Sequence, residues 1–557
     1  MFPQLDARQR ASCVAARQVS PRKGHEMKPL LQIVAAVGLS CLSSAHPVPV
    51  VVSPASVWLK TGQTQKFVVT TPGYRMVVWS VDKGKISATG LYRAVAGADT
   101  VTVTATPPRC LSCKGTATVN VVTPPMTYTA RTDQTVLQLP NPMPTWGGAN
   151  GAGTTWVNPE FPAAVYTRLT DSATSLIAGA TIQTADSGEP QLGSIDGLHF
   201  VVKGTGGHSY VIDTKTAAKT GIDSKYHSLQ FSSRQPLVLV GLDQTAIRLI
   251  VAKPDWSGVA SDRVVFDFAS TGCLGVGFKS TWSGIFSISN DDTTFKTSFS
   301  NTGGQGTGNY VVAWSAAKGC SVYDTLQGVV YRRGVLLGTI DDGENPLADR
   351  FYLHEGGGGE SARFSMLAGT IRKPDGTPGC VAGNCLVDRP YLWQVNTTHV
   401  RPCSYQCDGH SAKGATGFYS GKNQRFHMYK SLEQPLTPMA NFPPGFPDQH
   451  GSAHNQATTE PVFLVSADTT PVSPYPVWGY DEVLGIPTDG SQIVYRMGQT
   501  LNTGTSQYFI CQNSIMGISQ DGHDAYFTSD MGGNGVLGYE ADGVTPRCDV
   551  FKLTLPY

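Results

Sequence analysis

Seven short segments of this 557-residue chain share one pattern: an apolar residue, an aromatic or large apolar residue, then Asp, Lys, Gln or Arg. The segments are VID (211–213), VFD (265–267), VYD (322–324), LWQ (392–394), MYK (428–430), VYR (494–496) and VFK (550–552). Their spacing of 36 to 70 residues indicates a repeated supersecondary unit that buries its apolar face by stacking on its neighbours. A second pattern, Ser-x-Asp-Gly/Asp followed by an aromatic residue, occurs at 194–200, 289–295 and 519–526.

Together the two patterns resemble the WD40-like repeats of TolB-type β-propellers, whose units read SPDG, an aromatic strand, then an IYVMD-like strand. The resemblance implies a seven-bladed β-propeller over residues 161–557, in which the SxDG hairpin joins strands A and B and the VYD pattern is strand C. The last VFK is followed only by LTLPY, so the final blade lacks a fourth strand. VYTRLTD (165–171) resembles the RxLT fourth strand of such units, and we expect it to pair with the last blade and close the ring.

The composition favours an all-β chain. Gly (61) and Pro (36) are plentiful, Thr, Ser and Val recur in runs, and long helical periodicities are missing. Residues 124–160 contain GGANGAG and are expected to form an irregular lead-in to the propeller. The net charge of +1, with 15% charged residues, supplies no general field for nucleic acid, so we expect no nucleic-acid partner.

Residues 48–123 show strand-like alternation interrupted by turns. The opening VSPASVWLKTGQTQKF, the VWSV segment around Trp79, the GLY turn at 90–92 and two closing strands resemble bacterial immunoglobulin-like domains of group 2. The resemblance implies an N-terminal immunoglobulin-like sandwich with Trp79 in its core, which serves as a spacer or anchor. Nothing in this stretch points to chemistry.

The long apolar run, 27–45, has the features of a cleaved signal peptide: Lys28, a short apolar stretch and small residues at its end. It is too short to span a bilayer, so we expect no transmembrane span. Residues 1–26 are polar and Arg-rich and are expected to be a mis-called extension before Met27. A lipoprotein with Cys41 as the lipidated residue is the alternative. The protein is therefore expected to be bacterial and secreted, at the cell surface or periplasmic.

Twelve cysteines are present, and removal of everything through residue 45 leaves ten. An even number in an exported chain indicates disulfides more than metal sites. The expected pairs are Cys110–Cys113, Cys273–Cys320, Cys380–Cys385, Cys403–Cys407 and Cys511–Cys548. In the propeller scheme Cys273 and Cys511 precede strand A and Cys320 and Cys548 precede strand C, so these two disulfides would lie on one face.

The same face opens on the central channel, and three histidines followed by Ser or Asn lie near the expected start of strand A: His227, His410 and His454. Converging imidazoles hold divalent metal ions or act as general bases. A distant resemblance to oligogalacturonate lyases, which hold a divalent cation in a seven-bladed propeller, implies the same, although their clustered His/Gln motif is not visible. Loop aromatic residues are candidates for stacking on sugar rings: Trp256, Trp282, Tyr405 and Trp478.

Ser519, Asp521 and His523 have the side-chain types of a hydrolase triad within five residues. The same Ser-x-Asp frame recurs at Ser194 and Ser289 without the histidine, which predicts a hairpin turn instead of a catalytic site. The leading hypothesis is therefore a non-catalytic, monomeric exported protein that binds a glycan or a protein. The alternative is a metal-assisted polysaccharide lyase or hydrolase at the channel mouth that uses His227, His410 and His454.

Overall fold

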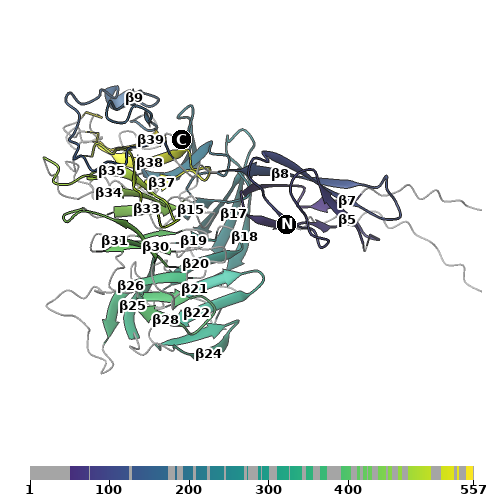
Figure 1. Cartoon of the computed structure of the whole chain (residues 1–557). Helices are drawn as coiled ribbons and strands as arrows, with labels where there is room; N and C mark the ends of the chain where they lie inside the picture. Colours follow the sequence, from purple (N-terminus) through teal and green to yellow (C-terminus); the bar gives the residue numbers. More distant parts are fainter. Residues whose placement is uncertain are drawn as a thin grey trace, which may run out of the picture. The chain divides into compact units, whose positions relative to one another are not determined.

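The structure of the protein is a computed structural model and is all-β (Figure 1). It describes residues 50–74, 76–123, 128–172, 182–184, 192–204, 209–222, 226–243, 246–268, 273, 286–289, 292–299, 310–324, 327–340, 347–355, 364–372, 391–402, 411–413, 418–422, 425–429, 437–446, 449–453, 462–466, 474–502, 516–531, 536–537 and 547–555. The described residues include one short 3-10 helix, η1 (Gly148–Asn150), and a single helical residue at Phe268. The predicted all-β class is confirmed.

Three small sheets occupy the N-terminal part of the described chain. They are β2 (Ser56–Lys60), β8 (Gly115–Val122), β7 (Thr100–Thr106) and β5 (Val78–Val81) in one sheet, β1 (Val52–Ser53) with β4 (Val68–Val69), and β3 (Thr64–Lys66) with β6 (Leu91–Arg93). The fully buried aromatic residues here are Phe67 and Tyr92, whereas Trp79 is only partly buried. Trp79 thus packs against this core, as predicted, but at its margin, and the aromatic residues at its centre are Phe67 and Tyr92. The immunoglobulin-like assignment stays a prediction.

Seven larger sheets follow in chain order, and each is antiparallel with neighbouring strands paired. The first three are β11 (Ile182–Thr184), β12 (His199–Gly204), β13 (Ser209–Asp213), β14 (Lys219–Ile222); β15 (His227–Phe231), β16 (Val238–Asp243), β17 (Ala246–Ala252), β18 (Val259–Asp267); and β19 (Ser287–Ile288), β20 (Thr294–Phe299), β21 (Tyr310–Ser315), β22 (Gly319–Asp324), β23 (Val329–Arg332), β24 (Val335–Thr339). The third sheet thus has six strands, two more than the repeat predicts.

The next three sheets each have four strands. They are β25 (Leu347–Glu355), β26 (Phe364–Arg372), β27 (Tyr391–Gln394), β28 (Val400–Pro402); β29 (Ser411–Lys413), β30 (Phe418–Lys422), β31 (Arg425–Tyr429), β32 (Thr437–Asn441); and β33 (Gln449–Ala453), β34 (Val462–Ser466), β35 (Glu482–Ile486), β36 (Tyr495–Gln499). The last sheet combines β37 (Met516–Ile518), β38 (Asp524–Ser529) and β39 (Asp549–Thr554) with β10 (Val165–Arg168) and β9 (Thr155–Val157). Consecutive sheets lie side by side in Figure 1: β29 contacts β33, and β33 contacts β37.

The last sheet also contacts the first, because β11 lies against β38 and β39. The predicted pairing of VYTRLTD with the final sheet is confirmed: Val165 pairs with Thr554 and Arg168 with Phe551. The fully buried Arg168 donates to the fully buried Asp549 at 2.6 Å and to the carbonyl of Trp146 at 2.7 Å. A strand from the beginning of this region and a strand from its end are therefore joined by backbone pairing and a buried ion pair.

The predicted strand register is only partly confirmed. VID, LWQ, MYK and VFK lie on third strands, β13, β27, β31 and β39. VFD, VYD and VYR lie instead on fourth strands, β18, β22 and β36. The triplet occurs on third and on fourth strands, and also on β18, none of whose residues is buried, so it does not by itself distinguish a third strand from a fourth.

The predicted irregular lead-in is also partly wrong. Strand β9 pairs with β10 and adds a fifth strand to the last sheet. Tyr128, Trp146 and Phe161 are buried in the same apolar cluster as Phe551. Apolar side chains of the lead-in thus cover the edge and one face of the last sheet.

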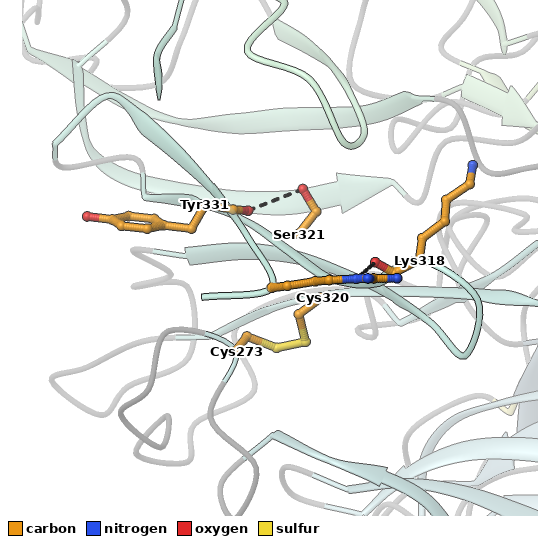
Figure 2. The surroundings of a disulfide bond; sticks show 6 residues. Cys273, Lys318, Cys320, Ser321 and Tyr331 are labelled. Atoms are coloured by element: carbon orange, nitrogen blue, oxygen red, sulfur yellow. Dashed lines mark hydrogen bonds between the residues drawn. A yellow bond between two sulfur atoms is a disulfide. The ribbon is translucent and has the colours of Figure 1, made fainter. Parts of the chain in front are cut away.

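Two of the predicted disulfides are present among the described residues, Cys110–Cys113 and Cys273–Cys320. Figure 2 shows Cys320 on β22 joined to Cys273, next to the hydrogen bond from Ser321 Oγ to the Tyr331 carbonyl on β23. Because β22 is a fourth strand, Cys320 does not precede a third strand as predicted. Cys548 is also disulfide-bonded, and its expected partner Cys511 lies outside the described residues, as do the Cys380–Cys385 and Cys403–Cys407 pairs.

Candidate functional site

Most of the sequence-predicted site residues fall outside the part of the chain that the structure describes. Trp282, Tyr405, His410 and His454 lie in undescribed segments. His227 begins β15, but its side chain is not described. Their convergence on a channel therefore stays a prediction. Within the described residues, no group of three His, Cys, Asp or Glu side chains is arranged to hold a metal ion.

The Ser-x-Asp segment of the last sheet is a turn, as predicted. The buried hydroxyl of Ser519 accepts hydrogen bonds from the backbone N–H groups of His523 and Asp524, at 3.1 and 2.9 Å. Asp521 Oδ2 lies 3.5 Å from His523 Nδ1, so these two side chains are neighbours within the turn. The serine is nevertheless occupied by the backbone of its own turn, which supports the rejection of a catalytic triad.

The first and third sheets contain the same turn. Ser194 Oγ accepts from the His199 N–H at 3.0 Å, and Ser289 Oγ accepts from the Thr294 N–H at 2.9 Å. Ser and Asp side chains that bind backbone N–H groups a few residues later stabilise such turns locally. The three turns therefore have an architectural role, and the one in the first sheet also fixes the start of β12.

A cavity of about 440 Å³ lies where β12 begins, between the first sheet and the turn that joins β17 to β18. It is lined by His199, Val211, Asp213, Ala218, Thr220, Pro254, Asp255, Trp256 and Ser257. His199 and Asp213 are register partners on the antiparallel strands β12 and β13. Side chains of directly opposed residues point to the same face of a sheet, about 5 Å apart at Cβ. The imidazole and the carboxylate therefore share one wall of the cavity.

Trp256 comes from the neighbouring sheet and is held by its turn. Its N–H donates to the Lys253 carbonyl at 2.9 Å, and its carbonyl accepts from the Thr220 hydroxyl. Pro254 suits the turn because its ring fixes φ, and Asp255 Oδ1 accepts from the Ser257 N–H at 3.1 Å. The sequence KPDWSG thus places an indole ring beside β12.

The indole ring stacks on His199 with a centroid distance of 4.3 Å and an interplanar angle of 27°. Trp256 and His199 are each only 8% exposed. Trp256 is therefore a wall of the cavity and not the open stacking platform that the sequence predicts. The His199 Nδ1 atom is buried and has no hydrogen-bond partner within the described structure.

The electrostatics of the cavity follow from burial and backbone hydrogen bonds. Burial lowers the pKa of His199 below its usual range, although the nearby carboxylates Asp196 and Asp213 act in the opposite direction. Burial opposes ionisation of Asp213, but the N–H groups of Thr216 and Lys215 donate to its Oδ1 and the net effect lowers its pKa. At neutral pH the site therefore combines a neutral imidazole with an ionised carboxylate.

A second, smaller cavity of about 340 Å³ contains Trp478, the other tryptophan predicted to contact sugars that the structure describes. Its walls include Asn441 and Gln492, whose side-chain amides hydrogen-bond to each other at 2.9 Å. Because these amides bind each other, they have less capacity for a ligand than the unpartnered His199 Nδ1. The cavity beside His199 is the stronger candidate.

His199 and Asp213 were both within sequence patterns, SIDGLHF and VID, but were interpreted only as blade markers. The signal that could have found them is the hairpin register, which places the histidine opposite the aspartate. The approach of Trp256 from another sheet has no such signal.

No family model matches the chain. No curated protein matches it either. Solved β-propellers are similar to it at low identity. An oligogalacturonate lyase in complex with manganese is 12% identical, with 77% of this chain and 99% of that chain covered and a TM-score of 0.43. An oligogalacturonate lyase from Vibrio parahaemolyticus (11%, 72% and 96%, TM-score 0.40) and the WD40 repeats of RRP9 (10%, 70% and 97%, TM-score 0.35) are also similar.

Within the described residues, no helix is long and apolar enough to cross a membrane. The disulfides indicate an oxidising compartment, extracellular or periplasmic.

Proposed function

We propose that the protein is an exported binding protein whose residues 161–557 form a seven-bladed β-propeller closed by β10. Seven antiparallel sheets in chain order, with the last in contact with the first, support this architecture. In the same proposal residues 48–123 are an immunoglobulin-like module that acts as a spacer or anchor. Residues 27–45 are a signal peptide that directs the chain to the cell surface or periplasm.

We propose further that the propeller binds a glycan in the cavity beside His199. The observation that carries this proposal is the buried, unpartnered His199 Nδ1, which lies next to a carboxylate and an indole ring. Small-ligand sites combine apolar walls with a few placed polar groups, and a sugar ring offers both an apolar face and hydroxyl donors. A bound hydroxyl group would donate to Nδ1 or to the carboxylate and complete their hydrogen bonding.

A glycan array with the purified protein tests this function. The His199→Phe variant keeps an aromatic ring against Trp256 but removes the nitrogen atoms, so its affinity should fall by about tenfold or more, which corresponds to about 1.4 kcal/mol. His523→Phe is the matched control, because His523 lies in the turn of the last sheet and does not line the cavity. If the protein binds no glycan on the array, or if His199→Phe binds the same glycan as tightly as the unaltered protein, the proposal is contradicted.

The alternative function, a metal-assisted polysaccharide lyase or hydrolase, depends on His227, His410 and His454. No observation on the described residues favours it over glycan binding. Metal analysis of the purified protein and an assay for unsaturated sugar products test it separately.

A further inference from the structure

We infer that the cavity beside His199 selects an amino sugar, a sugar ring that carries a protonated amine, over neutral and acidic sugars. This inference rests on the proposed glycan binding and names the ligand class of the same site. It follows from the charges and the hydrogen-bonding capacity of the residues that line the cavity.

The lining of the cavity is negatively charged. Two of its nine residues are aspartates, Asp213 and Asp255, and none is Lys or Arg. Backbone N–H groups donate to an oxygen of each carboxylate, which favours the ionised form. Lys253 interacts electrostatically with Asp255 but does not line the cavity. A ligand in the cavity therefore meets two carboxylates.

The lining is also rich in acceptors. When ionised, the carboxylates of Asp213 and Asp255 accept hydrogen bonds and cannot donate them. The Thr220 hydroxyl already donates its hydrogen to the Trp256 carbonyl, so it can only accept a hydrogen bond from a ligand. His199 has a buried Nδ1 without a partner, and a neutral imidazole accepts at that atom when Nε2 carries the proton. An ammonium group has three donors and no acceptor, so it matches these groups better than a hydroxyl group does.

The two carboxylates also disfavour acidic sugars. A uronate would bring a third negative charge against them, and such like-charge contacts are unfavourable. Trp256 stacks on His199 and is only 8% exposed, so its indole ring supplies an apolar wall and not a cation–π contact.

Calorimetric titration with three oligosaccharides tests the inference: glucosamine oligomers, N-acetylglucosamine oligomers and galacturonate oligomers. The first two share the same ring and differ in the charge on nitrogen. We expect the glucosamine oligomer to bind about tenfold more tightly than the N-acetylated form. Raising the salt concentration from about 0.05 to 0.3 M should weaken it, because the attraction is electrostatic.

The Asp213→Asn variant should lose this preference while it keeps the shape of the side chain. Asp489→Asn is the matched control, since Asp489 Oδ1 also accepts from a backbone N–H, that of Ser491 at 2.8 Å, in a turn of another sheet. Should Asp213→Asn fail to fold, Asp255→Asn removes the other charge at an exposed position and should reduce the preference in the same direction.

If an N-acetylglucosamine or galacturonate oligomer binds as tightly as the glucosamine oligomer, or more tightly, the inference is overturned while the proposed glycan binding stands. The same holds if another neutral or acidic glycan on the array is the preferred ligand. Binding of no glycan at all would remove the proposed function together with the inference, so the two failures are distinguishable. Loss of glucosamine binding in Asp213→Asn, with full binding in Asp489→Asn, would support the inference.

Discussion

Replacing Arg168 by alanine removes the guanidinium group that joins β10 to β39. Arg168 and Asp549 are fully buried, with 2.6 Å between Nη2 and Oδ2. Nε also donates to the Thr170 carbonyl at 2.9 Å, and Nη1 to the Trp146 carbonyl at 2.7 Å. The substitution therefore leaves a buried carboxylate with one fewer cation and leaves carbonyl groups without donors.

Removal of one partner of a buried ion pair costs about 3–5 kcal/mol. The orphaned carbonyl groups would add about 1–3 kcal/mol each in the absence of water. The space vacated by the long side chain admits water, and Arg547 still donates to Asp549 at 3.0 Å, so these additions are largely offset. We expect the free energy of unfolding to fall by about 4 kcal/mol.

Urea unfolding followed by tryptophan fluorescence measures this loss. Trp146 reports on the affected sheet, because its ring centroid lies 5.1 Å from that of Phe551 on β39. Thr167→Ala is the matched control on the same strand, at a half-buried position, and should cost less than about 1 kcal/mol. If Arg168→Ala loses no more than this control, the reasoning that the buried pair holds the last sheet together is wrong.

Three further predictions concern stability. Replacing both cysteines of Cys273–Cys320, which are 47 residues apart, should lower the free energy of unfolding by about 4 kcal/mol in the chain-entropy model, and an unchanged urea midpoint would contradict this. Burial raises the pKa of Asp481 from 3.8 to about 7 despite hydrogen bonds from its neighbours. As pH rises, Asp481 ionises in the unfolded chain before it ionises in the folded protein, so the free energy of unfolding should decrease between about pH 4 and 7. Urea unfolding of Asp481→Asn should show a smaller change of this free energy with pH. Gly90→Ala should cost about 2–3 kcal/mol by thermal unfolding, because φ is +83° and a Cβ would lie 2.6 Å from the backbone carbonyl oxygen of Phe67. Gly490→Ala, with φ of +82° and open space around it, should cost about 1 kcal/mol; equal losses would show that the contact is unimportant.

The sequence predicted those features that depend on local chemistry. The Ser-x-Asp turns at Ser194, Ser289 and Ser519 were predictable because each serine binds backbone N–H groups only four or five residues away. The pairing of β10 with β39 was predictable because the last repeat lacked a strand and an RxLT segment was available.

Features that depend on packing between sheets were not predictable in this way. Strands β18 and β22 carry the same triplet as the third strands, although none of the residues of β18 is buried and almost all of those of β22 are, so the triplet indicates neither burial nor position in the sheet. The site depends on the meeting of His199 with Trp256, which lies 57 residues later on a turn of another sheet. No periodicity or motif predicts a contact between residues that far apart in the chain. The sequence therefore indicated Trp256 as a candidate, but it predicted neither the contact with His199 nor the burial of the indole ring.

The last sheet combines strands from distant parts of the chain, β9 and β10 with β37 to β39, and this has a consequence for biosynthesis. Arg168 and Asp549 are 381 residues apart, so at about 5–20 residues per second a ribosome needs roughly 20–75 s to make the second after the first. Throughout this interval the pairing edge of β10 has no partner, and unpaired strand edges recruit other chains. A chain of this design is safest when it remains unfolded until β39 has been synthesised. The synthesis of β39, and not the folding of any earlier sheet, is then the event that permits β10 to reach its native pairing.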